Sequence, residues 1–100
     1  MEKIITVDEF MIRNYQIKVS GLVQGVWFRK YTCDEALSLG LTGFVRNEPD
    51  GSVYAEAQGE EAQLSLFLEF LKSGSPLSKV DSVDHKNIPI TNLKSFDINR

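Results

Sequence analysis

The sequence lacks an excess of basic residues, and this absence limits what the protein can bind. Lysine and arginine together number 11 against 14 aspartate and glutamate residues, which gives a formal net charge of −3. Affinity for nucleic acids depends largely on clustered lysine and arginine, so the composition excludes a general binder of polyanions. We therefore expect no nucleic-acid partner, and an anionic substrate needs a local site.

Long apolar runs and paired cysteines are also absent. No stretch approaches the roughly 20 apolar residues that a membrane-spanning helix needs, and the N-terminus has no basic region followed by an apolar core. The one cysteine, Cys33, cannot form an internal disulfide, which fits a reducing compartment. The sequence therefore predicts no membrane partner and a cytoplasmic location.

The length of the chain suits one compact domain. One hundred residues, 42% of them hydrophobic, can bury a single core but not two. Residues 1–12 precede the first clearly alternating segment and carry no recognisable cap or turn signal. We therefore expect an N-terminal extension over residues 1–12 and one folded domain over residues 13–100, present as a monomer.

Hydrophobic periodicity predicts the first strand and the first helix. Tyr15, Ile17 and Val19 alternate with polar residues, the period of two expected of a half-buried strand. Residues 28–39 instead have the pattern of an amphipathic helix, which Gly40 is well placed to end. The apolar arc of this helix comprises Phe28, Thr32, Cys33, Ala36, Leu37 and Leu39.

The rest of the chain predicts a hairpin, a second helix and two further strands. Their ranges are 41–47 and 53–58 for the hairpin, 60–72 for the helix, and 80–88 and 96–98 for the last strands. This order contains the split β-α-β pattern of ferredoxin-like folds. We therefore predict an α+β protein, a ferredoxin-like α/β sandwich (βαββαβ) with two helices on one face of an antiparallel sheet. Such a fold serves many functions, so it does not identify the chemistry.

The segment from Gly21 to Arg29 is a candidate anion site. It leaves a strand and enters a helix, so successive backbone N–H groups can converge at a helix N-terminus, where anions bind. Gly25 lets the backbone approach a ligand closely, and Arg29 can add charged, bidentate contacts to phosphate oxygens. Taken alone, the same residues also suit an ordinary glycine-containing turn with a solvated arginine.

Two longer motifs resemble a known family. Val23-Gln24-Gly25-Val26-Trp27-Phe28-Arg29-Lys30-Tyr31-Thr32 resembles the phosphate-binding loop and first helix of acylphosphatases. Gly40-Leu41-Thr42-Gly43-Phe44-Val45-Arg46-Asn47, followed by Pro49-Asp50-Gly51-Ser52-Val53, resembles their second signature, although Phe44 stands where the family often has tryptophan. The resemblance covers roughly residues 14–98, and two long motifs in the right order are far more specific than a single glycine loop.

This resemblance implies an enzyme that hydrolyses acyl phosphates to a carboxylate and inorganic phosphate, without a metal or other cofactor. Arg29 matches the family's phosphate-binding arginine, and Asn47 matches its water-positioning asparagine. The backbone amides that match its phosphate cradle belong to Gln24, Gly25, Val26, Trp27, Phe28 and Arg29. The domain over residues 13–100 is then acylphosphatase-like, with inorganic phosphate and sulfate expected as competing anions.

Other residues that could carry chemistry have a simpler structural interpretation. Arg46 neighbours Asn47 on a strand, so its side chain should point to the opposite face, as a surface arginine. Cys33 lies within the apolar arc, which favours a buried thiol over a nucleophile. His85 has no cluster of metal ligands around it, and Asp50 suits a tight turn. We expect none of these four side chains in the site.

Two points of mechanism stay open at this stage. Trp27 either packs beside the loop or contacts an acyl group. Asn47 can orient water but cannot accept its proton, so we hypothesise that the phosphate of the substrate does. The alternative to an enzyme is a module that binds an anion or serves a larger assembly without chemistry. An RNA-binding version is disfavoured because the sequence has no aromatic, basic signature for it.

Overall fold

The computed structural model describes residues 11–99. The expected N-terminal extension, residues 1–12, therefore lies almost wholly outside the described residues. Of its last two residues, Ile12 already belongs to the first strand, which begins three residues before the predicted start at Tyr15. The expected division into an extension and a domain stays a prediction.

The described residues form five strands and two helices in the predicted order. The elements are β1 (Ile12–Leu22), α2 (Phe28–Ser38), β2 (Thr42–Asn47), β3 (Val53–Glu60), α3 (Glu61–Ser73), β4 (Lys79–Ile88) and β5 (Phe96–Ile98). Predicted and observed ends differ by at most three residues, and the differences arise because a periodicity defines the middle of an element better than its ends. Neither of these helices is long and apolar enough to cross a membrane.

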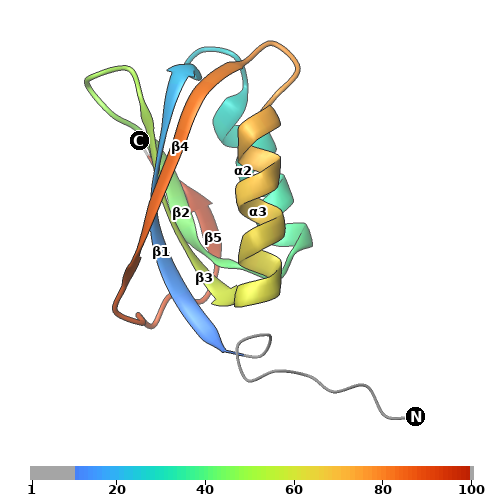
Figure 1. Ribbon diagram of the computed structural model, residues 1–100, viewed down its shortest axis with the longest axis vertical. Helices are drawn as coiled ribbons and strands as arrows, with labels where there is room; N and C mark the ends of the chain where they lie inside the picture. Colours follow the sequence, from blue (N-terminus) through green and yellow to red (C-terminus); the bar gives the residue numbers. More distant parts are fainter. Residues whose placement is uncertain (1–10, 100) are drawn as a thin grey trace.

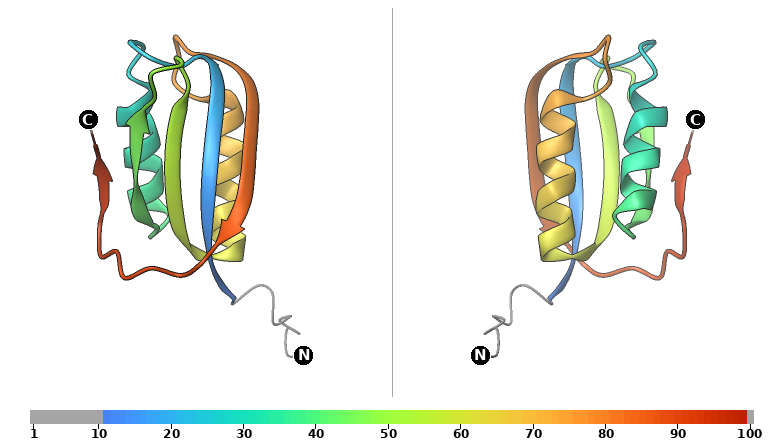
Figure 2. Two further views of the ribbon diagram at one scale, coloured as in Figure 1. Left: turned by 90° about the vertical axis from the view of Figure 1, so that its left-hand side faces the viewer. Right: turned by 90° about the vertical axis from the view of Figure 1, so that its right-hand side faces the viewer.

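A single sheet carries both helices on one of its faces (Figures 1 and 2). Its strand order is β4-β1-β3-β2-β5. The β1–β3, β1–β4 and β2–β3 pairs are antiparallel, as predicted for a ferredoxin-like sandwich. The arrangement confirms the predicted fold class.

The edge strand β5 departs from the expected antiparallel sheet. It pairs in parallel with β2, so the sheet is mixed. The reason is the path of the chain: after β4 ends at one edge, the connection runs along one end of the sheet and β5 rises at the opposite edge (Figure 2). β5 therefore follows the direction of β2, which the pattern of a three-residue strand could not indicate.

The core lies between the sheet and the two helices. Ile17 and Val19 on β1 are completely buried, so the predicted alternation correctly identified the inner face of the strand. Each such side chain stabilises the fold by about 1.5–3 kcal/mol through removal of apolar surface from water. The helices contribute Phe28, Thr32, Cys33 and Ala36 from α2, and Leu64, Phe67 and Leu71 from α3.

Leu37 is the exception within the predicted apolar arc of α2. Its side chain is 55% exposed, whereas Ala36 beside it is completely buried. The sheet and α3 cover only a narrow stripe of α2, and Leu37 lies outside that stripe. The sequence pattern was therefore wrong about the orientation of this one leucine.

Gly43 fixes how closely β2 approaches β3. Its φ is 145°, and a β-carbon added there would collide with the backbone carbonyl of Glu56. Only glycine allows this close contact between the two strands. The glycine thereby maintains the register that brings Asn47, at the end of β2, opposite Val53.

Candidate active site

The loop between β1 and α2 opens toward solvent at one end of the sandwich. The β2–β3 hairpin and the α3–β4 connection lie at the same end (Figure 1). Gly25 has a φ of 72°, in the left-handed region that glycine adopts at little cost, and an added β-carbon would meet no atom within 4 Å. The backbone at Gly25 is therefore open to the approach of a ligand.

The N-terminus of α2 offers backbone donors to an anion. Trp27 is the N-cap residue, and its side chain makes no capping hydrogen bond to the helix. The first turn contains no acidic residue. Because the first N–H groups of a helix have no partner within the helix, they remain available to a bound anion, which the helix dipole also favours.

Gln24 ties this loop to the β2–β3 hairpin. Its side-chain amide donates two hydrogen bonds, to the backbone carbonyl of Glu48 at 2.8 Å and to that of Ser52 at 2.9 Å. These two carbonyls flank the turn that follows Asn47. The contact therefore joins the segment that leads to Arg29 with the segment that carries Asn47.

Ser75 holds the loop from the other side. Its hydroxyl is buried and donates a 2.7 Å hydrogen bond to the backbone carbonyl of Val26. The side chain of Phe28, at the start of α2, is also buried in the core. These contacts anchor Val26 and Phe28 to the core side of the loop. The backbone of the loop therefore faces the open side, toward solvent.

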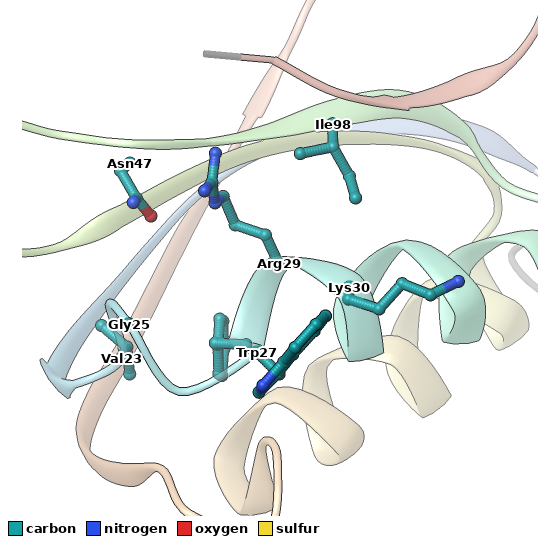
Figure 3. A pocket seen from close by; sticks show the side chains of 8 residues that line it. Val23, Gly25, Trp27, Arg29, Lys30, Asn47 and Ile98 are labelled. Carbon is teal, nitrogen blue, oxygen red and sulfur yellow. The ribbon is translucent and has the colours of Figure 1, made fainter.

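Arg29 projects from the first turn of α2 toward Asn47 (Figure 3). The guanidinium donates a hydrogen bond from Nη1 to the backbone carbonyl of Asn99, at 3.3 Å. This bond is long for an N–H donor, and the remaining donors of the planar group stay available for a fork of contacts to phosphate oxygens.

Asn47 reaches the same pocket from the end of β2. Its Oδ1 atom is buried, and no described residue donates a hydrogen bond to it. Buried polar atoms usually have a hydrogen-bond partner. Among residues 11–99, three buried side-chain oxygens have none, and Asn47 is the one of these three residues that lines the pocket. The pocket has a volume of about 420 Å³ and is lined by Val23, Gly25, Trp27, Phe28, Arg29, Lys30, Asn47 and Ile98.

Arg46 lies outside this pocket, as the sequence predicted. Its guanidinium stacks over the ring of Tyr54, with 4.6 Å between the central carbon and the ring centroid, and pairs with Glu48 at 3.1 Å. The two contacts hold the side chain on the opposite face of the strand.

Burial, together with the hydrogen bond to Glu56, raises the pKa of Tyr54 to about 12, so this phenol stays protonated.

Asp50 serves the hairpin turn. Its carboxylate accepts hydrogen bonds from the backbone N–H and the hydroxyl of Ser52, and it pairs with Lys18 at 3.0 Å. The contacts to Ser52, followed by the one to Lys18, lower the pKa of Asp50 below its usual value. The predicted structural role of this residue is confirmed.

Cys33 and His85 also lie away from the pocket. Cys33 is buried, and its thiol donates a 3.5 Å hydrogen bond to the backbone carbonyl of Phe96. Burial raises the pKa of this thiol. His85 is exposed on β4 and its ring lies 4.8 Å from that of Tyr15. Among residues 11–99, no three histidine, cysteine, aspartate or glutamate side chains are grouped so as to hold a metal ion.

The structure brings together in one pocket the loop, Arg29 and Asn47 that the sequence proposes for the site. The sequence did not indicate the side chains that hold them in place. The sequence predicts a role for the backbone amide of Gln24 but none for its side chain, and it predicts no role in the site for Ser75. The Ser75–Val26 contact joins residues 49 positions apart, so no local pattern could have revealed it.

The fold and the pocket define a class of protein. It is a small α/β sandwich in which an arginine from the first helix and an asparagine from a strand end line one pocket beside a glycine-containing loop. A glycine-containing loop before a helix occurs in many unrelated proteins. Far fewer proteins combine such a loop with this strand order and with these two side chains.

Comparison with known proteins identifies the family. The family model for acylphosphatase matches residues 15–98. An acylphosphatase of Archaeoglobus fulgidus is 49% identical over 83 residues, which are 83% of this chain and 93% of that protein. One of Ligilactobacillus salivarius is 42% identical over 88 residues, covering 87% and 98% of the two chains. The crystal structure of an acylphosphatase from Bacillus subtilis superposes with a TM-score of 0.86 at 38% identity, covering 90% of this chain and all of the other.

The chain belongs to the acylphosphatase family. The resemblance inferred from the two sequence motifs is thereby confirmed, and so is the predicted enzyme class, a hydrolase of the acylphosphatase type.

Proposed function

We propose that this protein hydrolyses the carboxyl–phosphate anhydride of acyl phosphates, with Arg29 binding the phosphate and Asn47 positioning the attacking water. The observation that carries the proposal is the convergence of Arg29, Asn47 and the open backbone at Gly25 on one pocket of about 420 Å³. The substrate phosphate would lie against the loop amides from Gln24 to Arg29, within reach of the guanidinium.

The chemistry required of these groups is modest. A carboxylate is a good leaving group, so placement of the reactants and stabilisation of charge can supply most of the rate enhancement. Loop amides and Arg29 would balance the charge on the phosphoryl oxygens as bonding shifts from one oxygen to another. Asn47, which lines the pocket, would form a hydrogen bond to water through its side-chain amide and so orient the nucleophile.

The proton of the attacking water needs an acceptor. The side chains that line the pocket include no carboxylate and no histidine. A neutral amide and two cationic side chains are poor bases. We therefore assign this role to a nonbridging oxygen of the substrate phosphate, so that the phosphoryl group leaves the reaction as inorganic phosphate.

A steady-state assay with benzoyl phosphate tests the proposal. Turnover should persist in the presence of EDTA, because the proposed charge stabilisation comes from Arg29 and backbone amides. Inorganic phosphate and sulfate should compete with the substrate, since the loop presents donors to any tetrahedral oxyanion. Binding of phosphate without turnover would instead indicate the alternative, an anion-binding module without chemistry.

The proposal includes a cytoplasmic monomer. Cys33 is unpaired and buried in the core, which fits a compartment where thiols stay reduced. Arg29, Asn47 and the glycine loop, to which the proposal assigns the chemistry, all belong to one domain of one chain. Sedimentation equilibrium at micromolar concentration tests the monomer.

A further inference from the structure

Trp27 has an unusual backbone and an unusual exposure for a tryptophan. Its φ of 64° makes it the only residue other than glycine with a positive φ among residues 11–99. Bulky side chains rarely adopt this region, because it is strained for every residue except glycine and, less so, asparagine. Even so, the indole is not buried in compensation: Trp27 is 72% exposed. A strained, exposed aromatic residue at the edge of a binding pocket suggests that it contacts a ligand.

A second pocket begins on the other side of this indole. It has a volume of about 530 Å³, and its apolar lining comes from Val26, Trp27, Tyr31, Pro76 and Leu77. Leu77 is 72% exposed and Tyr31 is also exposed, so apolar surface is concentrated here on two elements, α2 and the α3–β4 connection. An apolar surface of this kind favours contact with an apolar group.

The charged residues of this second pocket neutralise each other. Lys30 pairs with Asp34 across one helical turn, with 2.9 Å between Nζ and Oδ1. The pair contributes no net charge to the lining. The pocket therefore suits an uncharged apolar group better than an acyl group that carries its own carboxylate.

The two pockets adjoin each other at Trp27 and Lys30, which line both of them. Asn47 lines only the first pocket. In Figure 3, Asn47 lies on one side of the Arg29 guanidinium, and Trp27 and Lys30 lie toward the other side. When a phosphoryl group is transferred, the attacking and leaving oxygens lie roughly in line on opposite sides of phosphorus. Water held at Asn47 would therefore direct the leaving carboxylate toward Trp27.

We propose that Trp27, Tyr31, Pro76 and Leu77 form a subsite for the acyl group of the substrate, selective for uncharged apolar and especially aromatic acyl groups. This inference rests on the proposed function, because it assumes that the phosphate of an acyl phosphate occupies the loop. The indole and the phenol provide flat faces for stacking against an aromatic ring, and Leu77 adds apolar surface to the same pocket.

Acyl phosphonates test this subsite without requiring turnover, since their carbon–phosphorus bond resists hydrolysis. Calorimetric titration with benzoylphosphonate, acetylphosphonate and inorganic phosphate gives three dissociation constants. We expect benzoylphosphonate to bind about 10-fold more tightly than acetylphosphonate, the gain typical of burying part of an aromatic ring. Equal affinity for the two phosphonates would overturn the proposal.

Two leucine variants provide a matched comparison. Leu77→Ser should reduce the preference for benzoylphosphonate over acetylphosphonate to about twofold, because it removes apolar surface from the subsite. Leu37→Ser should keep the full preference, since Leu37 is an exposed leucine of α2 about 15 Å along the helix from Trp27. An unchanged preference in Leu77→Ser would contradict the assignment.

Fluorescence of the wild-type protein provides a second measurement that does not depend on any variant. Trp27 is the single tryptophan of the chain, so all indole emission reports on this position. Benzoylphosphonate should change the emission beyond the change produced by saturating inorganic phosphate, whereas acetylphosphonate should not. Emission that is the same with all three ligands would overturn the contact.

The outcomes separate this inference from the proposed function. No turnover of benzoyl phosphate, combined with preferential binding of benzoylphosphonate, would contradict the hydrolytic function and support the subsite. Turnover of benzoyl phosphate, combined with equal affinity for both phosphonates, would support the hydrolytic function and contradict the subsite. If the apolar surface instead binds a second copy of this chain, Leu77→Ser would abolish a concentration-dependent dimer without changing the phosphonate preference, and the subsite would be wrong.

Discussion

The hydroxyl of Ser75 donates a 2.7 Å hydrogen bond to the backbone carbonyl of Val26, in the loop between β1 and α2. Ser75 is only 3% exposed, so little water can replace this bond if the hydroxyl is removed. The contact links the end of α3 to the loop before α2, two segments that the chain brings together only in the folded state. It makes the shape of the loop depend on the packing of the whole domain.

Ser75→Ala should therefore weaken both the fold and the site. Loss of a buried hydrogen bond costs about 1–2 kcal/mol, and each kcal/mol lowers the melting temperature of a domain this size by about 4–8 °C. Affinity for inorganic phosphate should fall several-fold, measured by calorimetry on the folded variant. Ser65→Ala, on the exposed surface of α3, is the control and should change neither quantity.

Arg29→Ala and Asn47→Ala should differ in what each variant still binds. Arg29 would contact phosphate in both the bound state and the transition state, so phosphate affinity and turnover should fall together. Asn47 would contact the attacking water, so its loss should reduce turnover by about 10²–10³, or about 3–4 kcal/mol, by analogy with removal of one transition-state donor. Phosphate affinity of Asn47→Ala should remain near that of the wild type.

Arg46→Ala provides the control for both substitutions. It removes an arginine next to Asn47 whose side chain stacks on Tyr54 outside the pocket, so turnover should stay near normal. Calorimetry with phosphate and hydrolysis of benzoyl phosphate measure the two effects, with circular dichroism to verify folding. The proposed division of roles is wrong if Asn47→Ala loses phosphate affinity as severely as Arg29→Ala, or if it retains normal turnover.

Asp50 should make the stability of the hairpin depend on pH in the acid range. Its hydrogen bonds to Ser52 and its pairing with Lys18 lower the pKa of this carboxyl in the folded state. A lowered folded pKa means that the stabilisation is complete above the unfolded pKa of about 3.9 and is lost as the pH falls below it. The free energy of unfolding of Asp50→Ala should therefore fall below that of the wild type by more at pH 7 than at pH 3.

Urea unfolding at the two pH values measures this difference. Asp81→Ala, which removes an exposed carboxylate from β4, controls for the general effect of net charge. A gap between wild type and Asp50→Ala that is equally large at both pH values would contradict the assignment of the effect to the ionised carboxylate.

Removing residues 1–10 should leave stability and activity nearly unchanged. β1 begins at Ile12, and neither of the two sequence motifs includes a residue of this segment. Removing residues 1–12 should lower the melting temperature, because the carbonyl of Met11 accepts a 3.1 Å hydrogen bond from the N–H of Glu61 at the start of α3. Thermal unfolding and turnover of the two shortened chains test where the folded domain begins. A large loss of stability or turnover on removal of residues 1–10 would refute the predicted boundary.

The pattern of residues was sufficient for most of the fold. Alternation at Ile17 and Val19 and the helical spacing of Phe28, Cys33 and Ala36 correctly identified side chains that face the core. Such periodicities are local, since each depends only on the geometry of one element. The parallel pairing of β5 was not predictable in this way, because it depends on a connection that runs from one edge of the sheet to the other.

The sequence by itself determined the loop glycines, the position of Arg29 at a helix start and that of Asn47 at a strand end, and these indicated both the family and the chemistry. Only the tertiary structure decided what holds them together and what lies beside them. Gln24 reaches carbonyls 24 and 28 residues away, and Trp27 lies exposed between two pockets instead of packing in the core. Contacts at such separations depend on how the whole chain packs, and no local pattern of residues encodes them.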